Sequence, residues 1–98
     1  MALGVPAERV MLVRAELPGG GASVGSGTLL RGRLVLTAAH VVFGDDGEPL
    51  AAIRVGPPGI PVLPAGRVLW PDRYVPGGGR DAALLEISDS TWVPPPGT

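Results

Sequence analysis

The sequence predicts an all-β domain built from six short strands. Glycine (16 residues) and proline (12 residues) are far more frequent in this 98-residue chain than in an average protein. Both residues favour turns and interrupt helices. Short runs rich in Val, Leu and Ile recur between these turn signals. This alternation is typical of a β-barrel or a β-sandwich.

Turn-forming residues separate the expected strands. Arg31-Gly32 lies between two apolar runs and predicts a β-hairpin. Residues 38–43, "AAHVVF", predict one helical turn, and residues 71–80 predict a long surface loop. Prolines interrupt residues 60–66, which favours an edge segment or a loop. The six strands are predicted at residues 9–17, 24–30, 33–37, 51–56, 66–70 and 81–88.

Length, charge and cysteine content limit the classes of function. A chain of 98 residues suits one small domain with a modest core. The net charge of -1 gives no electrostatic surface for nucleic acid or for an anionic membrane. Cysteine is absent, the first residues lack a basic signal-peptide region, and no apolar run is long enough to span a membrane. We therefore expect a cytoplasmic protein that contacts neither membrane nor nucleic acid.

His40 is the only histidine, and it follows a strand-like run within "LTAAHVV" (36–42). Two interpretations are open for it: a general base, or a core histidine bonded to the backbone. Asp81 precedes the apolar run 82–85, which places this carboxylate at the edge of a core. A buried carboxylate needs a hydrogen-bond partner, so we expect His40 and Asp81 to lie within hydrogen-bonding distance.

Two stretches together resemble the trypsin-like serine protease family, in its disulfide-free bacterial type. They are "GSGTLLRGRLVLTAAHVV" (25–42) and "DAALLEI" (81–87), and the segment between Val68 and Asp81 follows the family's layout. The resemblance implies a six-stranded antiparallel Greek-key barrel, the first of the family's two barrels. It also implies that His40 is the general base and that Asp81 orients it.

The resemblance does not extend to the nucleophilic serine, because no segment of this chain matches the family's G-D-S-G-G motif. The serines present are Ser23, Ser26, Ser88 and Ser90. We expect the isolated chain to be inactive, because members of a catalytic triad act as a unit. The implied partners are a second barrel, or remaining chain, that supplies the serine, and a peptide or protein substrate. The alternative is a protease-derived binding or scaffold module without catalysis.

The remaining motifs predict structural roles. Residues 1–90 should form the barrel, and residues 91–98, with three consecutive prolines, a tail or linker rather than a polyproline ligand. The acidic run 44–48 lacks the ligand pattern of a calcium loop, so no metal and no cofactor are expected. The "GSG" at 25–27 alone indicates turn chemistry.

Four larger side chains also receive structural predictions. Arg31 and Arg33 flank the predicted hairpin turn and are expected to be solvated. Trp70 and Tyr74 are expected to pack beside the loop that carries Asp81.

Overall fold

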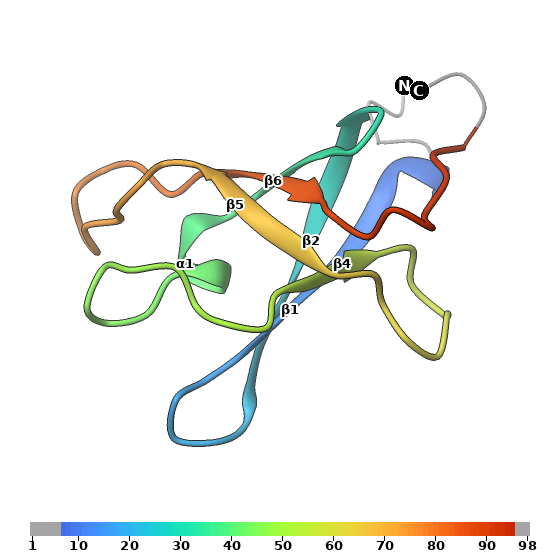
Figure 1. Cartoon of the computed structure of the whole chain (residues 1–98). Coiled ribbons are helices and arrows are strands. Elements are labelled where there is room, and N and C mark those ends of the chain that lie inside the picture. The colour runs from blue at the N-terminus through green and yellow to red at the C-terminus, as the bar shows by residue number, and fades with distance from the viewer. Residues whose placement is uncertain (1–6, 96–98) are drawn as a thin grey trace.

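The computed structural model describes residues 7–95, which form one curled antiparallel sheet of six strands (Figure 1). The all-β class and the number of strands predicted from the sequence are therefore confirmed. The elements are η1 (Ala7–Arg9), β1 (Val10–Glu16), β2 (Ala22–Arg31), β3 (Leu34–Thr37), α1 (Ala39–Val42), β4 (Arg54–Gly56), β5 (Gly66–Trp70) and β6 (Ala83–Ile87).

The strands are ordered β4-β1-β2-β3-β6-β5, and every pairing is antiparallel. The predicted hairpin joins β2 to β3, with Gly32 at a φ of 55° that favours glycine. The sheet curls so far that its two edge strands meet. The N–H of Val55 donates to the carbonyl of Pro64 at 2.9 Å, and the N–H of Gly66 donates to the carbonyl of Ile53 at 2.9 Å.

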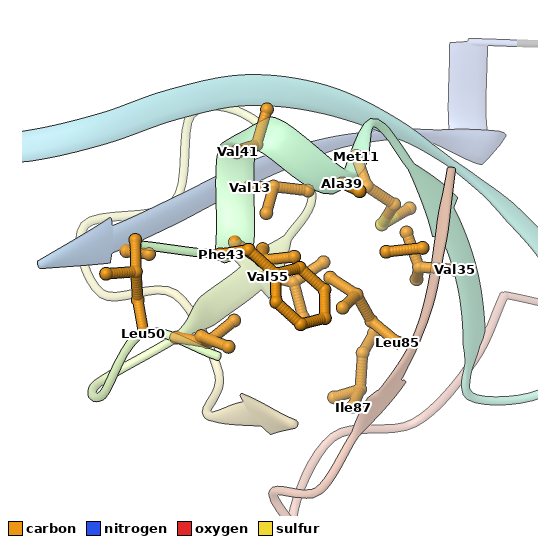
Figure 2. Packing of buried hydrophobic residues seen from close by; sticks show 14 of the residues in the cluster. Met11, Val13, Val35, Ala39, Val41, Phe43, Leu50, Val55, Leu85 and Ile87 are labelled. Atoms are coloured by element: carbon orange, nitrogen blue, oxygen red, sulfur yellow. The ribbon is translucent and has the colours of Figure 1, made fainter. Parts of the chain in front are cut away.

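One face of the sheet supplies the core, because side chains alternate between the two faces of a strand. On β3, Val35 and Thr37 are buried while Leu36 is 43% exposed, as the alternation predicts. Figure 2 shows side chains from β1, β3, β4, β6 and α1 pointing into this common interior. The buried apolar residues of the cluster are Met11, Val13, Ala15, Leu29, Val35, Ala39, Val41, Val42, Phe43, Leu50, Ile53, Val55, Ala83, Leu85 and Ile87.

Two predicted strands begin later than the sequence indicated. Within 51–56 only Arg54–Gly56 is extended, because Ala52 adopts a left-handed φ of 52° and bends the chain. At the other strand, Asp81 and Ala82 precede the first residue of β6. Asp81 therefore stands outside the ladder, at the point where the chain enters the sheet.

The prediction that Arg33 is solvated is wrong. Its guanidinium donates to the carbonyl of Ile87, the last residue of β6, and to three carbonyls in the segment that follows, at distances of 2.6 to 3.5 Å. The guanidinium carbon also lies 6.0 Å from the centre of the Trp92 ring, which packs partly against the core. The start of the predicted tail is thus attached to the β2–β3 hairpin, while residues 96–98 of that tail lie outside the described residues.

Candidate functional site

Glycines in the middle of β2 determine where His40 lies. A Cβ atom on Gly25 would come within 2.6 Å of Cγ2 of Val41, which follows His40 in α1. A Cβ atom on Gly27 would lie 2.8 Å from Cγ1 of Val35 in the neighbouring strand. A larger residue at either position would force the neighbouring side chain or backbone to shift. The two glycines lie within the strand predicted at residues 24–30, and they allow α1 and β3 to pack closely against β2.

The pairing of β3 with β6 brings Asp81 to His40. Thr37, the last residue of β3, is paired with Ala83, the first residue of β6. The chain segments beyond this pair therefore lie at the same end of the sheet. The buried Thr37 hydroxyl donates to the carbonyl of Ser26 at 2.8 Å, which attaches the end of β3 to β2.

Asp81 accepts two hydrogen bonds from His40, 41 positions away in the sequence. The backbone N–H of His40 donates to Oδ1 at 2.8 Å, and Nδ1 of the ring lies 2.6 Å from Oδ2. The predicted contact is present. Two bonds from one residue fix both the position of the helical turn and the direction of the imidazole ring.

The electrostatics of the pair determine which ring nitrogen is free. Hydrogen bonds from the ring and from the backbone of His40 lower the pKa of Asp81 below its ordinary value. Asp81 is therefore ionised at neutral pH and can only accept hydrogen bonds. Nδ1 must then carry the proton, which leaves Nε2 of a neutral ring with a free lone pair.

The pair is more open than the sequence indicated. The side chain of His40 is 65% exposed and that of Asp81 is 45% exposed, so the expectation of a buried carboxylate is wrong. The reason is its position before β6, where water reaches the carboxylate. Among residues 7–95, no protein group forms a hydrogen bond with Nε2, so this atom is available to a reactant.

Two loops dock beside the pair and hold Tyr74 against it. The N–H of Tyr74 donates to the carbonyl of Gly47 at 3.0 Å. Gly47 has a φ of 79°, and a Cβ atom there would lie 2.7 Å from the carbonyl oxygen of Tyr74. The Tyr74 ring also packs on Phe43 with centroids 5.8 Å apart, so the predicted packing role of Tyr74 is confirmed. Trp70, by contrast, is 48% exposed.

Tyr74 also interacts with Asp81, which the sequence analysis did not anticipate. Partial burial raises the pKa of the Tyr74 phenol above its ordinary value, and the charge of Asp81 and a hydrogen bond with it add to the effect. The phenol therefore stays protonated at neutral pH. Its hydrogen bond in turn contributes to the lowered pKa of Asp81.

A groove of about 760 Å³ adjoins His40. The end of β1 and the turn that follows form one wall, and the loop after α1 forms the other. Sequence reasoning missed this groove, because residues distant in the chain form it. The lining residues are Glu16, Leu17, Pro18, His40, Phe43, Gly44, Asp45, Asp46, Glu48, Pro49, Leu50 and Ala51.

In the described part of the chain the pair has no hydrogen-bonded serine and no set of metal ligands. No serine hydroxyl is hydrogen-bonded to His40 within residues 7–95. No group of three or more His, Cys, Asp or Glu side chains there could hold a metal ion. In the acidic loop, Oδ1 of Asp46 accepts the N–H of Glu48 at 3.0 Å, which is a turn contact.

No family model, no curated protein and no solved structure matches the chain. No helix in the described residues has the length and apolar character needed to cross a membrane. The functional inference therefore depends on the geometry of His40, Asp81 and their surroundings.

Proposed function

We propose that this chain is the histidine–aspartate half of a trypsin-like serine endopeptidase. His40 acts as the general base, and Asp81 orients its ring. One observation carries the proposal: Asp81 accepts hydrogen bonds from both Nδ1 and the backbone N–H of His40. The ring is thereby held with Nε2 directed away from Asp81, toward the space where a serine hydroxyl and a substrate would be placed.

The chemistry of peptide hydrolysis requires this arrangement. A serine hydroxyl is a weak nucleophile at neutral pH and needs a base that removes its proton as it attacks the carbonyl carbon. Nε2 of His40 takes that proton and later donates it to the leaving amine. The ionised Asp81 holds the required tautomer and stabilises the imidazolium while the ring carries both protons.

The strand order supports the barrel that the resemblance implies. β1, β2 and β3 follow one another, and β4 returns over a long connection to lie beside β1. This spatial order, with the fourth strand next to the first, is that of a Greek key. The backbone hydrogen bonds between β4 and the residues around the start of β5 support closure into a barrel.

The serine and the oxyanion-stabilising groups would come from a second module, in the same chain or in another. An apolar row on the outer face supports such a module. Leu36 is paired with Leu84, and Leu84 with Trp70, across β3, β6 and β5. Leu36 and Trp70 are 43% and 48% exposed, and exposed apolar side chains in a contiguous row favour a protein interface.

Two-chain reconstitution tests the proposal. The coding region downstream of this chain is searched for a G-D-S-G-G segment, and that segment is produced separately. We expect no hydrolysis of an activated peptide ester by either part alone, and hydrolysis by the mixture. His40→Ala should lower the rate of the mixture at least about 1000-fold, since triad members act as a unit. A mixture without activity, or a rate that His40→Ala leaves unchanged, would overturn the proposal and favour the non-catalytic module.

A further inference from the structure

We infer that the groove beside His40 binds a basic segment of the peptide substrate, with Arg or Lys side chains next to an apolar residue. This inference rests on the proposed function and adds the substrate class. Because His40 itself lines the groove, a segment bound there lies next to the bond that reacts.

The charges of the groove all have one sign. Its lining includes Glu16, Asp45, Asp46 and Glu48, and neither Lys nor Arg. These carboxylates come from both walls: Glu16 ends β1, and the other three belong to the loop after α1. A concave surface with charges of one sign concentrates ligands of the opposite sign.

Two of the four carboxylates are engaged within the protein, and two remain available to a ligand. The engaged ones are Glu48, whose Oε1 lies 3.6 Å from the Nε of Arg73, and Asp46, whose Oδ1 accepts the N–H of Glu48. Glu16 and Asp45 are exposed, and no arginine among residues 7–95 forms a salt bridge with either. They are therefore the groups we expect to pair with a basic side chain.

The apolar part of the lining matches the rest of a basic side chain. Leu17 is 41% exposed, and the rings of Pro18 and Pro49 line the groove with it. Phe43 and Leu50 lie beneath them, nearly buried. Arg and Lys pack their aliphatic stems on such surfaces while the charged end stays near carboxylates and water.

A second hollow has charged lining residues of the opposite sign. A smaller hollow of about 240 Å³ lies beside the loop that carries Asp81, and its charged lining residues are Arg73 and Arg80. Trp70 and Tyr74 complete its walls. Arg73 itself pairs with Glu48 of the groove, so Glu16 and Asp45 are the carboxylates left for a basic ligand.

Peptide binding to the 98-residue chain tests this inference without any catalysis. Two fluorescein-labelled hexapeptides are compared by anisotropy, one with a central Leu-Arg-Arg-Leu and one with Leu-Glu-Glu-Leu. At low salt we expect the basic peptide to bind at least about 10-fold more tightly, a difference that shrinks as the Debye length falls at high salt. The double variant Glu16→Gln/Asp45→Asn should weaken its binding about 3- to 10-fold, as expected for exposed ion pairs.

A matched control separates the groove from net charge. Glu8→Gln/Asp72→Asn also removes two exposed carboxylates, but neither residue lines the groove. We expect it to leave the dissociation constant within about 1.5-fold of the unmodified chain. Equal binding of the two peptides, no binding of either, or equal loss in both double variants would overturn the inference.

The outcome is independent of the test of the proposed function. If reconstitution gives no activity while peptide binding still depends on Glu16 and Asp45, the proposed function fails and the groove remains a basic-peptide site. If the mixture is active and binding ignores these carboxylates, only the inference about the groove fails.

Discussion

Each end of the β3–β6 ladder holds a basic side chain that is hydrogen-bonded to residues far away in the sequence. The two ends differ in whether a nitrogen of that side chain is left for a ligand or reactant. At one end Arg33 donates to the carbonyl of Ile87, the last residue of β6, and to three carbonyls beyond it. At the other end His40 donates to Asp81 just before β6. In Figure 1, α1 lies at one end of the sheet and the segment after β6 at the other.

The two ends differ in how much of the hydrogen-bonding capacity of the basic side chain is already used. Each terminal nitrogen of Arg33 has a carbonyl acceptor. Its contacts therefore only fix the chain. His40 donates from Nδ1 to Asp81, and among residues 7–95 no protein group forms a hydrogen bond with its Nε2. A bond that fixes the ring yet leaves one nitrogen open positions that nitrogen for chemistry.

The largest effect on stability is expected at the end of the ladder that holds Arg33. Arg33→Ala removes the donor for the carbonyls of Ile87, Asp89 and Trp92, and we expect a loss of about 3 kcal/mol in the free energy of unfolding. Denaturant unfolding measures this loss. Arg31→Ala is the matched control, because Arg31 lies across the same turn and is exposed; it should change stability by less than about 0.5 kcal/mol.

Equal stability of the two arginine variants would contradict the structural role of Arg33. It would mean that the segment beyond β6 is held by Trp92 and the core alone. Arg33 would then not be the residue that fixes this end of the ladder.

A smaller effect is expected from Gly25→Ala, at the end that carries His40. The added Cβ atom would lie 2.6 Å from Cγ2 of Val41, so α1 must shift or the side chain must change rotamer. We expect a loss of about 2 kcal/mol in the free energy of unfolding. The NMR signal of the His40 Nδ1 proton should weaken, because the ring moves with α1.

Gly19→Ala is the control for this variant. Gly19 lies in the turn after β1, and a Cβ atom there meets nothing within 4 Å. Its unfolding free energy and its His40 signal should match those of the unmodified chain. Unchanged behaviour of Gly25→Ala would show that Val41 can yield, and that Gly25 does not determine where His40 lies.

The parts of the fold that could be predicted from the sequence are those with a local signal. Turn residues and apolar runs marked the six strands. The contact of His40 with Asp81, which are 41 positions apart, was predicted from the resemblance of two stretches to a known family and not from a local signal.

The parts that could not be predicted depend on groups distant in the chain. Arg33 looks like an ordinary turn residue until its bonds to the segment beyond β6 are seen. The role of the glycines in β2 could not be predicted, because it depends on close contacts with Val41 and Val35 in other elements. The exposure of Asp81 follows from β6 starting two residues after it, a boundary that no local signal marks.

The ionisation of Asp81 is a further difference between the two ends. Its pKa is lowered mainly by the hydrogen bond from the His40 ring, so the ionised form stabilises the fold above the unfolded pKa of about 3.9. This contribution is lost as the pH falls through the lower folded pKa. In His40→Ala the pKa of Asp81 should rise toward its ordinary value, which carboxyl-carbon NMR resolves.

Asp89 is the internal control for that titration. Its pKa is also lowered, but by hydrogen bonds from the side chain and backbone of Thr91, at the other end of the ladder. His40→Ala should leave its titration unchanged. A pKa of Asp81 that also stays unchanged would show that His40 does not donate to it in solution.

The most direct measurement of the central claim is the tautomer of His40, read from long-range ¹H–¹⁵N NMR correlations of the neutral ring. With Asp81 bound to Nδ1, we expect the proton on Nδ1 and the free lone pair on Nε2. In Asp81→Asn this preference should weaken or reverse, because an amide can offer either a donor or an acceptor. A neutral ring with its proton on Nε2 in the unmodified chain would contradict the account, since the atom assigned as the base would then have no lone pair to accept a proton.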